Sequence, residues 1–298
     1  MAGYSAQLLR EAAPGKVNLC LYLGPTRPDG RHELVTVFES VSLADELTLT
    51  AHPGARHDEV ICPGVAGPNL VEAALATLRA RGWDAPPVRI KIVKRIPVAA
   101  GMGGGSADAA AALRLAGRVA PVPAATQREI ATELGADIPS QLVPGLSLGT
   151  GAGELIEPIA PIAPHAFAIV PLPHLLSTPA VYSEADRLGL SRSTADLGAL
   201  AAEFRNTPAA GRPPLVNDLE PAARSLCLAI EPGLEALTNA GADGVLVCGS
   251  GPTCAGLWWG DDGPERAKAA VTALLPRFPS ATTVVPVAGI GHNLSTDR

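Results

Sequence analysis

A glycine-rich segment at residues 94–113 holds the residue types of an anion-binding loop. It reads KRIPVAAGMGGGSADAAAAL, and it follows residues 88–93, in which apolar and basic side chains alternate. The alternation predicts a strand and the alanine run predicts a helix, so the glycines stand at the N-terminus of that helix. Glycines let backbone N–H groups approach a ligand closely, and the unpaired donors and dipole of a helix N-terminus favour negative charge. The segment therefore predicts a phosphate site, with a tightly packed turn as the structural alternative.

Two familiar phosphate loops do not fit this segment. A P-loop carries Lys and then Ser or Thr directly after its last glycine, whereas Gly105 is followed by Ser106 and Ala107. A dinucleotide fingerprint needs a third glycine at the place of Ser106 and an acidic residue about twenty positions further on. The chain reads VAPV at 119–122 instead. The loop therefore represents another class of phosphate site.

A lysine and an aspartate far apart in the chain are the candidates for catalysis. Lys16 begins an apolar strand, where a cation is unfavourable unless it is paired. Asn18 shares its face because side chains on a strand alternate with a period of two. Asp137 lies between Gly135, which ends a helix, and Pro139, in a constrained turn that suits a proton acceptor. The structural alternatives are a surface lysine on an edge strand and an aspartate that caps the next helix.

The elements that must position these residues form an α+β pattern. Thr126 and Glu129 have the spacing of a capping box at the start of one helix. The uncharged, proline-rich stretch 158–183 is expected to be a domain junction that leads into a strand and then a loop. Strands are expected at 17–23, 33–43, 47–50, 88–93, 165–170, 245–248, 254–259 and 282–287, and helices after the glycine loop and at 70–81, 126–134, 195–204, 219–227, 232–239 and 265–275. A length of 298 residues favours two domains that share a cleft.

Composition narrows the class of protein. Apolar residues make up 47% of the chain and aromatic residues only 3%, which predicts a core of Ala, Val, Leu and Ile. A net charge of −6 without a basic stripe argues against a nucleic-acid partner. The 5 cysteines lack metal-site spacing and a C-x-x-C pair, so reduced, buried thiols are expected. Residues 1–10 lack the features of a secretion signal, and the longest uncharged stretch has too many prolines for a membrane helix, so we expect a cytoplasmic protein.

Four segments occur in an order and spacing that resembles the GHMP small-molecule kinases. They are PGKVNL at 14–19, the glycine loop, LGADIP at 134–139 and GSGPT at 249–253. Two more, RPDGRHEL at 27–34 and NDLEP at 217–221, are similar to those of family members that act on a cytidine nucleotide. The resemblance covers most of the chain. It implies a ribosomal-protein-S5-domain-2-like N-terminal domain over residues 1–158, a ferredoxin-like C-terminal domain over 159–298, and an active site in the cleft between them.

The resemblance also implies roles for individual residues. Lys16 and Asp137 form the catalytic pair, in which Asp137 accepts or orients the proton of the alcohol and Lys16 stabilises negative charge on the attacking oxygen and the γ-phosphate. ATP, with Mg²⁺, is expected on the glycine loop. The expected ATP contacts are Asn69, Lys94, Pro97, Ala100, Gly101, Met102, Gly103, Gly104, Gly105, Ser106 and Ala107. The expected acceptor contacts are Asn18, Arg31, His32, Asp137, Thr178, Pro179, Tyr182, Gly249 and Ser250.

Two positions depart from the family pattern. The family usually has an aromatic residue, whose ring stacks on the base, where Arg31 stands before His32; the plane of a guanidinium can also stack. The resemblance makes His32 a contact to cytosine and Tyr182 the cover of the opposite face of the base. The alternatives are a surface histidine and a core tyrosine. Ser106 precedes Ala107 where the family commonly has two serines, which leaves Ser106 as the candidate ligand of Mg²⁺.

The residues and the resemblance together predict an ATP-dependent kinase, a transferase that phosphorylates a hydroxyl of a cytidine diphosphate-linked polyol. The nearest alternative is another kinase of the superfamily, of the homoserine or mevalonate type. A non-catalytic nucleotide-binding protein is disfavoured by the intact Lys16 and Asp137, and a Rossmann oxidoreductase by the missing third glycine. Simpler alternatives stay open for Asn69 and Lys94, as surface residues, and for 249–253, as a tight hairpin. Small molecules are the expected partners, with no nucleic acid and no membrane, for a monomer or a homodimer.

Overall fold

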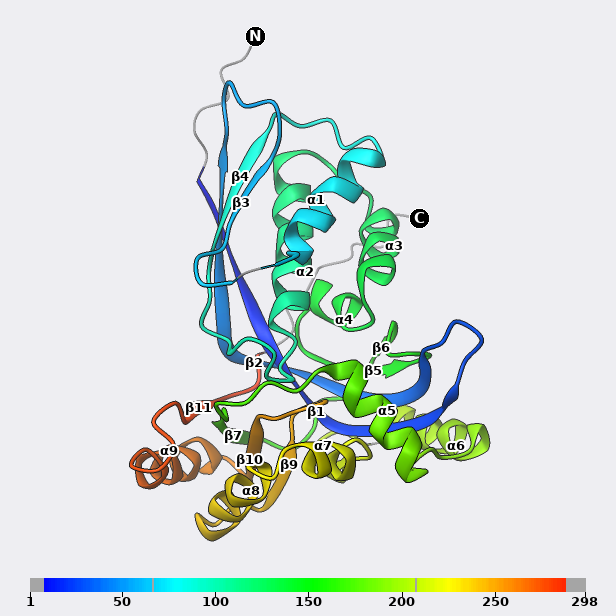
Figure 1. Ribbon diagram of the computed structural model, residues 1–298, viewed down its shortest axis with the longest axis vertical. Coiled ribbons are helices and arrows are strands. Elements are labelled where there is room, and N and C mark those ends of the chain that lie inside the picture. Colours follow the sequence, from blue (N-terminus) through cyan, green and yellow to red (C-terminus); the bar gives the residue numbers. More distant parts are fainter. Residues whose placement is uncertain (1–7, 66, 207, 288–298) are drawn as a thin grey trace.

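Two β-sheets with helices packed against them make up the part of the chain that the computed structural model describes, residues 8–65, 67–206 and 208–287. Figure 1 shows the larger sheet beside the helices of the N-terminal half and the smaller sheet with its own helices at the other end of the molecule. The strands of the larger sheet are β1 (Leu9–Thr26), β2 (His32–Ala51), β3 (Glu59–Ile61), β4 (Val88–Val93), β5 (Leu146–Thr150), β6 (Leu155–Pro158) and β8 (Val216–Asn217). They follow the order β3-β4-β2-β1-β8, with β5 paired to β2 and β6 to β5.

The smaller sheet is antiparallel and comes from the second half of the chain. Its strands are β7 (His165–Val170), β9 (Gly244–Val247), β10 (Cys254–Trp259) and β11 (Thr282–Val284), in the order β11-β7-β10-β9. Every residue of β7 is buried, which agrees with its uninterrupted apolar sequence AFAIV after His165. The strand therefore has side chains packed on both faces of the sheet.

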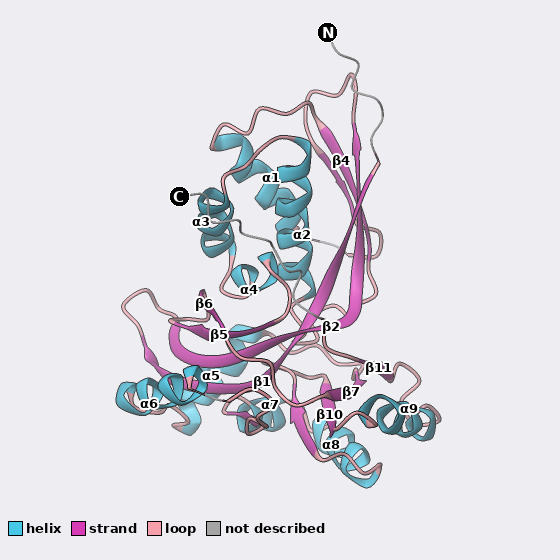
Figure 2. Cartoon of the chain, turned by 180° about the vertical axis from the view of Figure 1, so that it is seen from behind, coloured by secondary structure: helices cyan, strands magenta, loops and turns pink. Residues whose placement is uncertain are grey.

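The long pair β1 and β2 is the frame of the molecule. The two strands run antiparallel from Leu9 opposite Leu49 to Thr26 opposite His32. Their register shifts at three places, and the first shift lies between Pro14 and Lys16. Extra residues in one strand bend a ribbon and increase its twist, and Figure 2 shows the pair curving from one end of the molecule to the other. This curvature brings Lys16, in the first part of β1, near segments from both halves of the chain.

Helices cover each sheet. Beside the larger sheet lie α1 (Leu70–Ala80), α2 (Gly104–Val119), α3 (Ala124–Leu134) and α4 (Ile138–Leu142). The later helices are α5 (Thr178–Leu188), α6 (Thr194–Arg205), α7 (Glu220–Leu226), α8 (Ile230–Asn239) and α9 (Gly263–Leu274). The alanine run of α2 is buried throughout, because small side chains let this helix approach both the sheet and its neighbouring helices.

An apolar layer joins the two sheets. Val17 and Leu19 of β1 are fully buried in one cluster with Phe167 of β7 and Leu257 of β10. Burial of apolar area stabilises by roughly 25 cal/mol per Å², so this layer ties the two halves together as a core does. Residues from the second half also complete the larger sheet, because Asn217 of β8 pairs with β1.

A buried ion pair crosses the same layer. Glu39 of β2 and His165 of β7 lie 2.7 Å apart, with side-chain exposures of 5% and 2%. The other ring nitrogen, Nδ1 of His165, is 2.8 Å from the carbonyl oxygen of Ala163. Both ring nitrogens therefore face acceptors, which is the arrangement of a protonated imidazolium. Burial alone would lower the pKa of His165, but the hydrogen bond and charge of Glu39 raise it above its usual value of 6.5.

The first glycine-rich loop meets the second one at a point where only hydrogen fits. Gly101 has φ +78°, and a Cβ built on it would lie 1.9 Å from the carbonyl oxygen of Cys248. The second loop, 249–253, contains a cis peptide bond between Gly251 and Pro252. The fold therefore brings the backbones of two segments into contact that lie about 150 positions apart in the sequence.

Most expected elements are present, and two local expectations were wrong. The helix α3 begins at Ala124 after Pro123 without a side-chain cap, so Thr126 and Glu129 form no capping box. The proline-rich stretch does not end in a loop, because the helix α5 begins at Thr178 with Pro179 in its first turn. A proline is tolerated there since the first N–H groups of a helix have no partner within it.

Among the residues described, no helix is long and apolar enough to cross a membrane. The expected lack of a secretion signal concerns residues 1–10, of which 1–7 lie outside the described residues. The division into domains at residue 158 stays a prediction.

The charge on His165 predicts a pH-dependent stability. Because its pKa is raised in the folded state, the ion pair stabilises fully below the unfolded value of 6.5, and this contribution is lost as the pH rises through the folded value. We expect Glu39→Gln to lower the free energy of unfolding by about 1–3 kcal/mol near pH 6 and by less near pH 9. Urea titrations of both proteins at the two pH values measure this, with exposed Glu157→Gln as the control. An equal loss at both pH values would contradict the assignment.

The contact at Gly101 predicts a specific loss of stability. Gly101→Ala must move the backbone of Cys248, whereas Gly54→Ala has a similar φ of +82° and nothing within 4 Å. Both variants carry the strain of a positive φ, so their difference isolates the clash. We expect the free energy of unfolding to fall by about 1–3 kcal/mol more for Gly101→Ala than for Gly54→Ala. Equal values from chemical denaturation would show that the two loops do not meet as described.

Candidate active site

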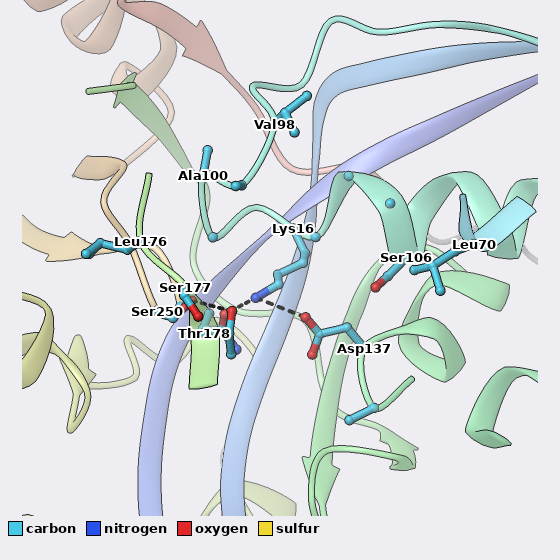
Figure 3. Close-up of a pocket in the computed structure, with 18 of the residues that line it drawn as sticks. Lys16, Leu70, Val98, Ala100, Ser106, Asp137, Leu176, Ser177, Thr178 and Ser250 are labelled. Carbon is cyan, nitrogen blue, oxygen red and sulfur yellow. Dashed lines mark hydrogen bonds and ion pairs between the residues drawn. The ribbon is translucent and has the colours of Figure 1, made fainter. Parts of the chain in front are cut away.

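A cavity of about 680 Å³ lies where the two glycine-rich loops meet β1 and β2. Figure 3 shows the side chain of Lys16 reaching into it, with Asp137 on one side and Ser177, Thr178 and Ser250 on the other. The predicted site residues that line the cavity are Lys16, Asn18, Asn69, Lys94, Pro97, Ala100, Gly101, Gly103, Gly104, Gly105, Ser106, Asp137, Thr178, Pro179, Tyr182, Gly249 and Ser250. A single cavity therefore collects segments that span more than 230 positions of the chain.

The first glycine loop has the form of an anion site. Helix α2 begins at Gly104, and Gly103 before it has φ 68° and provides no side-chain cap. The first turn carries no acidic residue. The N–H groups of Gly104, Gly105 and Ser106 precede the first intrahelical bond, which Ala107 N–H donates to the oxygen of Gly103. These donors border the cavity, so the loop can bind phosphate oxygens there.

Two of the predicted ATP contacts lie behind the loop. Met102 and Ala107 are buried, with exposures of 1% each, and neither lines the cavity. The carbonyl of Met102 accepts a hydrogen bond of 2.9 Å from the backbone N–H of Lys16. These two residues hold the loop against β1 and the core.

Lys16 is a buried cation at the centre of the site. Its Nζ donates a hydrogen bond of 2.6 Å to Oδ1 of Asn18 and lies 3.4 Å from Oδ2 of Asp137. The ring centroid of Phe38 is 5.7 Å away, within reach of a cation–π contact. The side chain of Lys16 is 5% exposed and that of Asp137 is 35% exposed. The carboxylate therefore stays accessible to a ligand while it pairs with the ammonium.

The orientation of Asn18 is fixed from behind. Its amide nitrogen donates to the hydroxyl of Thr36 at 2.7 Å, and that hydroxyl donates to the carbonyl of Cys20 at 2.7 Å. This chain leaves the amide oxygen of Asn18 directed at Lys16. The surface alternative for Lys16 is therefore excluded, and the prediction that Lys16 and Asn18 share a face is confirmed.

Asp137 does not serve as a helix cap. It occupies the N-cap position of α4, but its side chain makes no capping hydrogen bond there. Helix α3 ends at Leu134, Gly135 follows it in extended backbone, and Pro139 lies in the first turn of α4. The carboxylate is thus free to face Lys16 and the cavity.

The end of the cavity opposite the glycine loop is lined by hydroxyls and a tyrosine. The hydroxyls of Thr178 and Ser250 are 3.0 Å apart and join α5 to the second glycine loop. Tyr182 also lines the cavity, and its ring centroid is 5.3 Å from that of His32. Burial and the charge of Asp137 raise the pKa of Tyr182, so its hydroxyl stays protonated. This end can receive a planar group with polar edges.

The two residues expected beside Tyr182 are placed differently from each other. His32 is buried, with Nδ1 3.0 Å from the carbonyl oxygen of Gly24 and Nε2 3.3 Å from Asp186. It packs behind the cavity lining rather than in it. Arg31 is exposed and its guanidinium pairs with Asp29 at 3.0 Å, so it does not line the cavity either. Of Arg31, His32 and Tyr182, only Tyr182 lines the cavity.

The other end of the cavity holds a cluster of charges that the sequence did not reveal. Lys94 forms ion pairs with Asp45 and Asp108, and all three side chains are at most 15% exposed. Burial raises the pKa of Asp108, and Asp45 adds to this effect while Lys94 opposes it. An acidic residue inside an alanine run is the one sequence signal for Asp108, whereas nothing marks Asp45. Asn69 caps α1 by accepting from the N–H of Val71 at 2.8 Å.

A hydroxyl at the glycine loop is the candidate protein ligand of a metal ion. The described residues contain no group of three or more His, Cys, Asp or Glu side chains that could hold a metal ion. All cysteines are free, and all but Cys62 are buried, as expected. Magnesium bound to ATP takes most of its ligands from phosphates and water and needs only one or two from the protein. The hydroxyl of Ser106 on the cavity wall fits that requirement.

Known proteins are similar to this chain in sequence. Models described as "GHMP kinases N terminal domain" and "GHMP kinases C terminal" match residues 69–145 and 190–277. The 4-diphosphocytidyl-2-C-methyl-D-erythritol kinase of Streptomyces coelicolor is 42% identical over 82% of this chain and 85% of its own. That of Thermobifida fusca is 39% identical over 93% of this chain and 95% of its own.

Solved structures agree with these relatives. A crystal structure of 4-(cytidine 5'-diphospho)-2C-methyl-D-erythritol kinase matches with a TM-score of 0.73 and 32% identity, over 94% of this chain and 100% of that one. A homoserine kinase from Cytophaga hutchinsonii has a TM-score of 0.67, but its identity of 17% speaks for the fold alone. The α+β architecture and the expected resemblance are thereby confirmed. The chain belongs to the GHMP kinase family, within its group of 4-diphosphocytidyl-2-C-methyl-D-erythritol kinases.

Proposed function

We propose that the protein transfers the γ-phosphoryl group of ATP to the 2-hydroxyl of 4-diphosphocytidyl-2-C-methyl-D-erythritol, a step of non-mevalonate isoprenoid synthesis that takes place in the cytoplasm. The observation that carries this proposal is the Lys16–Asp137 pair, 3.4 Å apart, in the same cavity as the glycine loop. The names of relatives at about 40% identity give the substrate. The proposed partners are therefore two small molecules, ATP and a cytidine diphosphate-linked polyol.

The phosphates of ATP would lie on the N–H groups of Gly104, Gly105 and Ser106. Phosphoryl transfer depends mainly on positioning and on electrostatic stabilisation of the charge spread over the transferring group. A Cβ on Gly103 would lie 3.1 Å from Cε and Cγ of Lys16, so the lysine stem runs directly beneath the loop. An ammonium at this position can stabilise the γ-phosphate and the attacking oxygen together.

Asp137 would receive the alcohol. Its carboxylate is accessible, uses no capping bond and is held by Lys16, so one oxygen can accept a hydrogen bond from the substrate hydroxyl. In this role it orients the hydroxyl towards the phosphate and takes its proton as the new P–O bond forms and the bond from the γ-phosphorus to the β–γ bridging oxygen breaks, which releases ADP. Lys16, 3.4 Å away, holds the carboxylate in place.

Magnesium would accompany ATP, with Ser106 as its protein ligand. When bound, the ion offsets the charge of the phosphates. The hydroxyl of Ser106 lies one residue beyond the two helix-initiating glycines and borders the cavity, which supports this assignment.

The cytosine base would lie at the end of the cavity lined by Tyr182. Its ring provides a stacking face. The contact from His32 to the base that the resemblance implies requires the imidazole, which lies behind the lining with Nε2 3.3 Å from Asp186, to turn towards the cavity. Thr178, Pro179, Gly249 and Ser250 would border the diphosphate and the polyol. Stacking by Arg31 on the other face requires its guanidinium to leave Asp29.

The alternatives differ in the acceptor. Homoserine and mevalonate kinases share the fold, with identities of 17% and 16%, and these likenesses carry no information on the substrate. Neither acceptor has a base to place against Tyr182. The intact pair of Lys16 and Asp137 disfavours a non-catalytic nucleotide-binding protein.

Asp137→Asn tests the catalytic assignment. The amide keeps the shape of the side chain but cannot accept the proton, so we expect kcat to fall by about 10²–10⁴-fold. ATP binding, measured by calorimetry, should stay nearly unchanged because the loop donors are intact. The exposed Asp261→Asn serves as the control. A variant with wild-type kcat would refute the role of Asp137.

Tyr182→Ala tests the position of the base. Loss of a stacking ring costs about 1–3 kcal/mol, so we expect KM for the cytidylyl substrate to rise by about 5–150-fold while KM for ATP stays the same. Tyr182→Phe retains the ring and should resemble the wild type. Assays with homoserine and mevalonate as acceptors should give no product. If these alcohols react as well as the cytidylyl substrate, the proposed acceptor is wrong.

A further inference from the structure

Asp108 is a buried acid at the ATP end of the cavity that the mechanism above does not use. It lies in the first part of helix α2, directly after the glycine loop, and its side chain is 6% exposed. It nevertheless lines the cavity, together with Cys62, Asn69 and Leu70. Alanines surround it in the sequence on both sides, so its carboxylate interrupts an otherwise apolar helix face.

One oxygen of this carboxylate has no partner. Oδ2 of Asp108 accepts a hydrogen bond of 2.7 Å from Lys94, but Oδ1 is buried and makes no hydrogen bond to any described residue. A buried acceptor without a donor costs about 1–3 kcal/mol. Because Asp108 lines the cavity, a ligand donor that reaches this buried atom would satisfy it.

The neighbouring acid shows the contrast. Asp45 also binds Lys94, through Oδ2, but its Oδ1 accepts from the backbone N–H groups of Arg95 and Ile96. Asp45 is therefore satisfied within the protein, and it holds Lys94 in place. Of the two carboxylates in this cluster, Asp108 is the one with an acceptor left for a ligand.

The cluster does not suit a phosphate. Two carboxylates surround the single ammonium of Lys94, so the group carries excess negative charge when both are ionised. A polyphosphate would be repelled there, although Lys94 is a cation beside the loop. A neutral hydrogen-bond donor is the ligand group that fits an unpaired carboxylate oxygen.

The surrounding wall is suited to a nucleoside. Cys62, Val65, Pro68 and Leu70 give it an apolar lining, and Leu70 lies 3.6 Å from a Cβ built on Gly105. Figure 3 shows Leu70, the first residue of α1, beside Ser106 of α2. Both lie away from Thr178 and Ser250 at the acceptor end. With phosphates on the loop, the base and ribose of ATP would extend along this wall.

We propose that Asp108 selects the nucleoside of the phosphate donor: its Oδ1 accepts a hydrogen bond from the adenosine of ATP, given by the 6-amino group of adenine or by a ribose hydroxyl. Lys94 is a positioning residue that holds the carboxylate through Oδ2. Burial, with the charge of Asp45, raises the pKa of Asp108, and the hydrogen bond from Lys94 opposes this rise. This inference rests on the proposed function for the presence of ATP.

Asp108→Asn converts the acceptor into a donor. Lys94 can only donate, so the amide oxygen of the variant takes its place against Lys94 and the amide nitrogen replaces Oδ1. Steady-state kinetics with ATP, inosine triphosphate, 2′-deoxy-ATP and 3′-deoxy-ATP distinguish the two sources of the hydrogen bond. The exposed Asp84→Asn is the matched control, with wild-type ratios expected.

Two results would support the proposal. If the base is read, the wild type prefers ATP to inosine triphosphate in kcat/KM, and the variant lowers that preference by about 10-fold or more because a 6-oxo group now meets an N–H donor. If a ribose hydroxyl is read, the preference for ATP over one deoxy nucleotide falls by a similar factor. The ratio of ATP to inosine triphosphate then stays constant.

Three results would overturn it. The first is a variant that loses the same factor with all four nucleotides, as a purely structural role predicts. The second is a variant with wild-type ratios throughout. The third needs no variant and holds even if Asp108→Asn fails to fold: a wild type that uses all four nucleotides equally well. These three results are distinguished from failure of the proposed function by measuring how far ATP, without acceptor, raises the temperature of thermal unfolding. If the proposed function is wrong, ATP neither protects the protein nor gives product.

Discussion

The buried ammonium of Lys16 is the group around which the site is assembled. Removing a charge from water costs several kcal/mol unless partners replace the lost hydration. Here Asn18, Asp137 and the ring of Phe38 act as those partners, and they come from three different elements. Each must hold its position for the charge to be tolerated. The catalytic arrangement and the tolerance of the buried charge therefore rest on the same contacts.

The backbone around Lys16 explains why glycines lie where they do. Its N–H donates to Met102, which fixes the loop to β1, and its stem passes so close to Gly103 that a methyl group there would meet Cε at 3.1 Å. One strand also reaches every part of the core: Leu9 packs with the helices of the first half, Val17 with the layer between the sheets, and Leu21 with the helices of the second half. Along this strand, Lys16 lies between Ala13 of the first cluster and Val17 of the layer between the sheets.

Much of this arrangement is legible in the sequence because its signals are local. The period of two before the glycine loop and the alanine run after it predicted β4 and α2, and a cation in an apolar strand marked Lys16 as paired. The sequence does not predict helix α5, because the prolines of residues 158–183 are typical of a broken helix. Pro179 lies in the first turn, where a proline is tolerated. The pairs Lys94–Asp45 and Glu39–His165 join residues 49 and 126 positions apart, and no local pattern encodes such distances.

The two lysine–carboxylate groups beside the glycine loop, Lys16 next to Gly103 and Lys94 next to Gly104, differ in a way that fits their proposed tasks. Lys16 faces one partly exposed carboxylate, so charge is balanced and the acid remains open to an incoming alcohol. Lys94 faces two buried carboxylates, which neutralise its charge, and Oδ1 of Asp108 has no hydrogen-bond donor. A phosphate is thus repelled less at the Lys16 pair than at the Lys94 cluster, whose unpaired acceptor oxygen suits a hydrogen-bond donor. Since ATP presents phosphates at one end and donors at the other, this asymmetry favours one direction of binding.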